Sequence, residues 1–114
     1  MKHNFEKNLR IVNELMTYLH KLGSKDIHVT LQREESTTYF IVWGKINNIA
    51  NDELESLKNI LNTQRQHEVE EYYWHLGGEC EADPELSLVG MMIDKADISY
   101  EDNTLTFKIY RNDF

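Results

Sequence analysis

The sequence predicts an α+β fold: a two-layer α/β sandwich in which three or four helices cover a four-stranded, mainly antiparallel sheet made of two hairpins. Three observations lead to this prediction. A chain of 114 residues suits one domain, residues 1–114, with a single core. Two pairs of short segments alternate apolar and polar residues, as half-buried strands do, and longer segments repeat apolar residues at helical spacing. The predicted order is α-β-β-α(α)-α-β-β.

The first predicted helix covers about residues 5–22, because its apolar residues recur at three- and four-residue steps and share one stripe. Gly23 follows, and glycine is well suited to end a helix. The stripe consists of Phe5, Leu9, Val12, Leu15, Met16, Leu19 and Leu22. Because an apolar stripe of a surface helix normally faces the core, we expect these side chains to be buried.

The first hairpin is predicted from two strands that flank a polar turn. Ile27, Val29 and Leu31 alternate with polar residues, which is the period of a half-buried strand. The turn is Arg33–Ser36, and the following segment, Tyr39–Trp43, is apolar on both faces. A strand of that kind is typical of the middle of a sheet, so we expect Tyr39–Trp43 to be central.

Residues 51–76 contain no Gly or Pro and are predicted to be helical, either as one helix of about 39 Å or as two helices hinged near Asn62-Thr63. Another helix is predicted from Pro84 to about Lys95, since Pro favours the first helical position. It is apolar around most of its circumference, so we expect the core or a partner to cover it. The closing hairpin is predicted from Ile98, Tyr100, Leu105, Phe107 and Ile109.

The chain carries a net charge of −8, from 20 acidic residues against 12 Lys and Arg. Between Gln66 and Asp94 lie eight acidic residues and no Lys or Arg, so this acidic segment accounts for the whole net charge. Nucleic acids and anionic membrane surfaces require a basic patch, and because the sequence has none we expect neither as a partner. A basic protein partner or a cation fits the acidic segment better.

No apolar run reaches the roughly 20 residues of a membrane span, and the charged start of the chain does not resemble a signal peptide. The single cysteine, Cys80, cannot form an internal disulfide, which suits a reducing compartment. We therefore expect a cytoplasmic protein. Cys80 lies between two glutamates, which disfavour the reactive thiolate, so we do not expect it to be a catalytic nucleophile.

His67, Glu71 and His75 are the sharpest candidates for chemistry, because a spacing of four residues places them on one helical face. Together they form a plausible ligand set for a divalent transition metal such as zinc, iron or nickel. The favoured interpretation is a plain solvated face, since Val69, Tyr72, Tyr73 and Leu76 form an apolar stripe on the opposite side. A metal site is the alternative.

Trp74 is predicted to lie on the same outward face, between Glu70, Glu71 and His67. An outward tryptophan supplies a large apolar area and is common in binding hot spots, so these four residues form a candidate partner-binding surface. The alternative is that a neighbouring loop, such as Gly77–Asp83, covers Trp74. The sequence does not decide between the two.

No phosphate-binding motif and no cluster of nucleophile, base and oxyanion donor is recognisable, so we expect no enzyme, no catalytic residue and no cofactor. The favoured function is a small protein-interaction or regulatory module that self-associates as a dimer or larger homo-oligomer. Its basis is an excess of apolar surface, because a two-layer sandwich leaves one sheet face uncovered. The alternative is a metal- or small-ligand-binding domain that uses the face of His67, Glu71 and His75.

Overall fold

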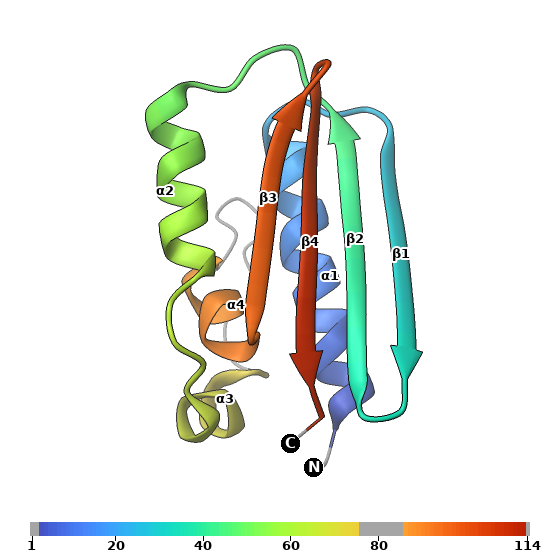
Figure 1. Ribbon diagram of the computed structural model, residues 1–114, viewed down its shortest axis with the longest axis vertical. Coiled ribbons are helices and arrows are strands. Elements are labelled where there is room, and N and C mark those ends of the chain that lie inside the picture. Colours follow the sequence, from blue (N-terminus) through green and yellow to red (C-terminus); the bar gives the residue numbers. More distant parts are fainter. Residues whose placement is uncertain (1–2, 76–85, 114) are drawn as a thin grey trace.

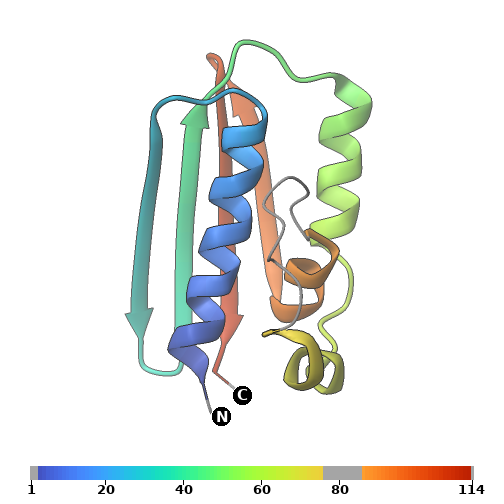
Figure 2. The same ribbon diagram turned by 180° about the vertical axis from the view of Figure 1, so that it is seen from behind.

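In the part of the chain that the structure describes, four antiparallel strands form one sheet, and four helices lie on a single side of it (Figures 1 and 2). The computed structural model describes residues 3–75 and 86–113. The strands are β1 (Ile27–Glu34), β2 (Thr37–Lys45), β3 (Lys95–Glu101) and β4 (Thr104–Asn112). The helices are α1 (Asn4–Lys21), α2 (Asn51–Leu61), α3 (His67–Tyr73) and α4 (Leu86–Met92). The predicted fold class and order of elements are confirmed.

The sheet consists of the two predicted hairpins, joined side by side through β2 and β4 in the order β1-β2-β4-β3. The β3–β4 turn, Asp102-Asn103, has both residues at positive φ, 52° and 58°. A two-residue turn of this kind matches the right-handed twist of the strands and fixes their register. The predicted central position of Tyr39–Trp43 is confirmed, since β2 lies between β1 and β4.

The segment 51–76 forms two helices rather than one, because the chain leaves the helical path after Leu61 and resumes it at His67. The break falls next to the predicted hinge at Asn62-Thr63. The end of α1 also agrees with the sequence. Gly23 adopts a left-handed conformation, φ 95°, and its N–H donates to the carbonyl oxygen of His20, which closes the helix.

The core lies between the helices and one face of the sheet. Phe40 and Val42 of β2 and Phe107 and Ile109 of β4 are fully buried beneath the helices. From the helical side come Ile11, Leu15, Leu19, Leu57, Leu61, Val89 and Met92. The all-round apolar helix predicted from Pro84 is therefore buried in the core rather than covered by a partner. It ends at Met92, because the chain continues into β3 from Lys95, and its predicted start lies outside the described residues.

The orientation of α1 differs from the prediction. Phe5, Leu9 and Met16 were expected to face the core, but they are 63%, 47% and 38% exposed. Lys7 and Glu14 are buried in their place. The helix is rotated because Lys7 takes part in a buried charge cluster, described below. Among the residues described, no helix is both long and apolar enough to cross a membrane.

Candidate interaction surface

The face of the sheet opposite the helices carries a row of large apolar side chains. Strand β2 alternates buried Phe40 and Val42 with Tyr39, Ile41 and Trp43, which point to the uncovered side. The row continues onto β4, where Tyr110 lies opposite Tyr39 in the register. Tyr110 is 44% exposed and Ile41 is 38% exposed. We call the group formed by Tyr39, Ile41, Trp43 and Tyr110 the open-face row.

Cross-strand contacts hold the aromatic rings of this row in place. The Tyr39 and Tyr110 rings meet edge to face, with centroids 5.1 Å apart and an interplanar angle of 78°. At the other end of the row, the His28 ring of β1 stacks on Trp43 at 3.9 Å and 8°. Both pairs sit directly opposite each other in the strand register, where such contacts stabilise a sheet. The row is therefore preorganised.

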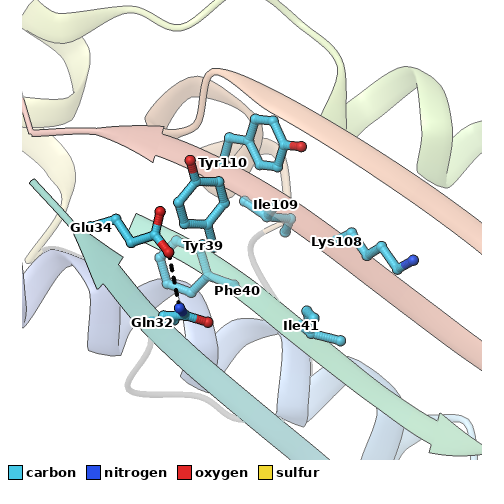
Figure 3. A pocket seen from close by; sticks show the side chains of 8 residues that line it. All are labelled: Gln32, Glu34, Tyr39, Phe40, Ile41, Lys108, Ile109 and Tyr110. Carbon is cyan, nitrogen blue, oxygen red and sulfur yellow. Dashed lines mark hydrogen bonds between the residues drawn. The ribbon is translucent and has the colours of Figure 1, made fainter. Parts of the chain in front are cut away.

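A shallow hollow of about 340 Å³ lies at the tyrosine end of the row. Figure 3 shows Tyr39 and Tyr110 close together, with Ile41 and Lys108 further along their strands. At the β1 rim, the Gln32 side-chain amide donates a hydrogen bond to the Glu34 carboxylate at 3.1 Å. The hollow thus has an aromatic and aliphatic floor with a polar rim, a composition found in protein-binding surfaces.

The charges on this face are balanced. By strand register, Lys45, Lys95 and Lys108 face the open side, together with Glu34, Asp97 and Glu101. Lys95 also lies 5.7 Å from the centroid of the Tyr110 ring, a cation–π contact. Three cations against three anions make the open face neutral, although the whole chain carries −8.

Helix α3 places the predicted site residues differently from the expectation. Tyr72 and Tyr73, predicted to face the core, are 74% and 51% exposed, whereas Glu70 is fully buried. The prediction is therefore wrong for these three residues, whereas His67, Glu71 and His75 are exposed, as the favoured interpretation of a solvated face predicted. Glu70 lies in the interior and is not on the surface that was expected to surround Trp74.

Three buried cations explain the position of Glu70. Its carboxylate accepts hydrogen bonds from Lys7 Nζ at 3.0 Å, Arg65 Nε at 3.0 Å and Arg111 Nη2 at 2.7 Å. Lys7 and Arg111 are 0% and 1% exposed, and Arg65 is 9% exposed. A buried carboxylate is tolerated when it is paired and hydrogen-bonded, and here the cations come from α1, the α2–α3 connection and β4. We call these four residues the buried charge cluster.

Two acids at the rim complete the cluster. Arg65 Nη1 donates to Asp94 Oδ2 at 2.8 Å, and Lys7 also forms an ion pair with Glu71. That hydrogen bond from Lys7 lowers the pKa of Glu71 below its ordinary value. Three acids of the segment Gln66–Asp94 are thus paired with cations from elsewhere in the chain. The segment is less acidic on the surface than its sequence implies.

Trp74 is half-buried and packs against the core. Its ring centroid lies 5.5 Å from that of His3, and its carbonyl oxygen accepts a hydrogen bond from Arg10 Nη1 at 2.9 Å. The tryptophan is therefore less outward than predicted. His67 and Glu71 are exposed, so a partner-binding role for these three residues stays a prediction. The loop Gly77–Asp83 lies outside the described residues.

The structure does not group His67, Glu71 and His75 as ligands of one metal ion. In residues 3–75 and 86–113, no three His, Cys, Asp or Glu side chains are grouped so that they could hold a metal ion. The Glu71 carboxylate is also bound to Lys7.

Comparison of the chain with models of protein families, and with curated proteins, found no match. The candidate site therefore rests on the geometry alone, which defines a two-layer α+β domain with one apolar sheet face that no element of residues 3–75 and 86–113 covers. One signal for that face was visible in the sequence, namely the apolar character of Tyr39–Trp43 on both sides. The buried charge cluster gave no such signal, since its members are separated by up to 104 positions, from Lys7 to Arg111.

Proposed function

We propose that this protein is a non-catalytic protein-interaction module that self-associates, and that the open-face row is its contact surface. The observation that supports the proposal is the row itself: Tyr39, Ile41, Trp43 and Tyr110 lie on the uncovered sheet face, ordered by contacts across the strands. Aromatic side chains of this kind supply most of the binding energy in protein interfaces.

A second copy of the chain is the partner that the charges favour. Copies that each carry −8 repel one another, but the open face is neutral and presents equal numbers of cations and anions to its counterpart. Face-to-face packing of two sheets is a common arrangement, and a two-fold axis in the sheet plane brings identical faces together.

The area of the face suits a dimer of modest affinity. Four strands spaced about 4.8 Å apart, each about 26 Å long, give a flat footprint of roughly 500 Å² per chain. A pair of chains then buries about 1,000 Å², which is near the lower limit for a specific interface. We therefore expect association in the micromolar range.

Light scattering coupled to size-exclusion chromatography tests the proposal. Ile41→Lys places a charge in the middle of the row and should lower the average mass at micromolar concentration. Ile60→Lys is the matched control, because Ile60 is an isoleucine of nearly equal exposure, 36% against 38%, on helix α2. A wild-type protein that elutes at the 13.5 kDa of one chain would contradict self-association. Equal masses for the two variants would place the contact elsewhere.

Two finer parts of the hypothesis stay predictions. A cytoplasmic location is supported by the single cysteine, Cys80. A basic protein partner is supported by the acidic segment, whose exposed member Glu71 lies near Trp74 in the sequence. If such a partner binds there, Trp74→Ala should weaken it more than Glu71→Gln, as measured by titration calorimetry with that partner.

A further inference from the structure

Strand β1 is an edge of the sheet, and its outer side is unusually well suited to pair with another strand. It is eight residues long, and its charged residues, Arg33 and Glu34, are at its last two positions, so the six residues Ile27–Gln32 contain no Asp, Glu, Lys or Arg. The other edge strand, β3, carries Lys95, Asp97 and Glu101 in seven residues. Charged residues on an edge discourage pairing, while a long, uncharged, β-branched edge favours it. The two edges are thus not equivalent.

The helix-facing side of β1 is also incompletely covered. Val29 points to the helical side, as its register partner Val42 does, yet it is 38% exposed. Figure 2 shows the reason, since α1 runs along the middle of the sheet and none of the helices drawn there lies over β1. In the described part of the chain, a partly exposed apolar surface therefore lies between α1 and the edge strand β1.

Helix α1 presents its own apolar side chains beside this partly exposed surface. Met16 and Ile27 line the same hollow of about 460 Å³, together with Asn13, Thr17 and His20. Leu9 and Phe5 continue the exposed stripe along the helix. None of these side chains is an Asp, Glu, Lys or Arg, in a molecule in which 28% of the residues are charged.

We infer that two copies of the chain join through their β1 edges, antiparallel about a two-fold axis perpendicular to the sheet. The two four-stranded sheets then form one continuous sheet. This axis keeps both helical layers on the same side, so the exposed stripes of the two α1 helices are turned toward each other across the paired β1 strands. Phe5, Leu9 and Met16 of one copy face those of the other.

A second copy explains this surface better than an isolated peptide strand does. A peptide could pair with the β1 backbone, but it would leave the exposed stripe of α1 in water. A second copy covers strand and helix together, and the lengths agree, about 26 Å for an eight-residue strand and about 27 Å for an 18-residue helix. Self-pairing also places no like charges opposite each other between Ile27 and Gln32.

The β1 contact is independent of the open-face row, and the two contacts are geometrically compatible. One axis is perpendicular to the sheet, whereas the axis proposed for face-to-face packing lies in its plane. Perpendicular two-fold axes that intersect generate a closed tetramer, and these two intersect when the axis of the face-to-face contact runs across the strands and meets the axis at the β1 join. With both contacts, we expect a mass four times the 13.5 kDa of one chain.

Mass measurement on four lysine variants and one double variant separates the contacts. Val29 and Ile41 have the same exposed fraction, 38%, and lie on the β1 edge and the open face respectively. We expect Val29→Lys and Ile41→Lys each to halve the mass, the double variant to give one chain, and the control Ile60→Lys to keep the wild-type mass. Met16→Lys, on the helix, should halve the mass as Val29→Lys does. Circular dichroism and the urea midpoint establish that each variant is folded.

The outcomes distinguish this inference from the proposed function. If Val29→Lys or Met16→Lys is folded and keeps the wild-type mass, the β1 contact is wrong, whatever Ile41→Lys does. If Ile41→Lys keeps the wild-type mass while Val29→Lys gives one chain, the β1 contact is supported and the open-face contact is wrong. A wild-type monomer at micromolar concentration overturns both. Capture of a peptide strand with the wild type monomeric would show that the edge serves another partner.

Discussion

Glu70 is the residue on which the buried charge cluster depends, because Lys7, Arg65 and Arg111 all donate to its carboxylate. Glu70→Gln retains the shape of the side chain but leaves three buried cations without the acid they share. Breaking a buried ion pair by removing one partner costs about 3–5 kcal/mol. We expect a loss of that size in the free energy of unfolding, measured by urea denaturation.

Glu71→Gln is the matched control, since Glu71 also binds Lys7 but its side chain is 47% exposed. Exposed ion pairs contribute about 1 kcal/mol or less. If Glu70→Gln and Glu71→Gln lowered the free energy of unfolding equally, the cluster would not act as a buried network. An unchanged stability for Glu70→Gln would contradict its burial altogether.

Tyr18 provides a test at high pH. Its hydroxyl donates a hydrogen bond to Glu53 at 2.5 Å, and burial, with that bond and the Glu53 charge, raises the pKa of Tyr18 well above its ordinary value of 10.0. The folded chain therefore retains this proton above pH 10, where the unfolded chain releases it. The resulting stability is complete below pH 10 and is lost above it, by about 1.4 kcal/mol per pH unit.

Tyr18→Phe should remove this contribution, because the ring still packs edge-on against Phe107, 6.4 Å away, but no hydroxyl is left to titrate. We expect the free energy of unfolding to fall less steeply in the variant than in the wild type above pH 10. Phenolate absorbance should show one wild-type tyrosine that ionises only on unfolding. Parallel slopes for the two proteins would be inconsistent with the buried hydroxyl.

At the scale of elements, the contact between α4 and α2 is unusually close at Gly90. A Cβ atom there would clash with the carbonyl oxygen of Ile60 and lie 2.9 Å from Thr63 Oγ1. In most helices Gly→Ala stabilises by about 1 kcal/mol, but overpacking of a rigid contact costs about 1–3 kcal/mol. We expect Gly90→Ala to be destabilising in urea denaturation, whereas Ser87→Ala, at an exposed position of the same helix, should not be.

The elements that were predicted correctly are those whose signal is local. Apolar alternation marked both hairpins, and the polar turn residues fixed their ends. The faces of α1 and α3 were predicted wrongly because their orientation depends on distant partners. Lys7 and Glu70 are polar residues that a local pattern assigns to water, and each is buried only because the other is. Four-residue spacing likewise suggested a metal site, but the Glu71 carboxylate is bound to Lys7, a distant partner.

The same limit applies to the candidate interaction surface. The uncovered sheet face could be predicted, because a two-layer fold leaves one face of its sheet without helices and because the segment Tyr39–Trp43 is apolar on both sides. The edge position of β1 and the exposed stripe of α1 could not be predicted, because they depend on the strand order and on the rotation of the helix. Both features arise from tertiary packing, and the periodicity of the sequence does not predict tertiary packing.

At the scale of the whole molecule, net charge determines how self-association responds to salt. Two chains of −8 whose centres lie about 27 Å apart, twice the radius of gyration of 13.4 Å, repel by roughly 10 kcal/mol in unscreened water. Screening reduces this to about 4 kcal/mol at 0.01 M salt and well below 1 kcal/mol at 0.15 M. Both proposed contacts carry no net charge. Neither therefore depends on a net attraction between charges that salt would weaken.

We therefore expect self-association to strengthen by at least tenfold between about 0.01 M and 0.15 M salt. Sedimentation velocity across that range measures the change directly. Binding to a basic partner through the acidic segment should respond in the opposite direction, because salt screens attraction between unlike charges. Self-association that weakens as salt rises would therefore show that the copies meet through charged residues rather than through the open-face row or the β1 edge.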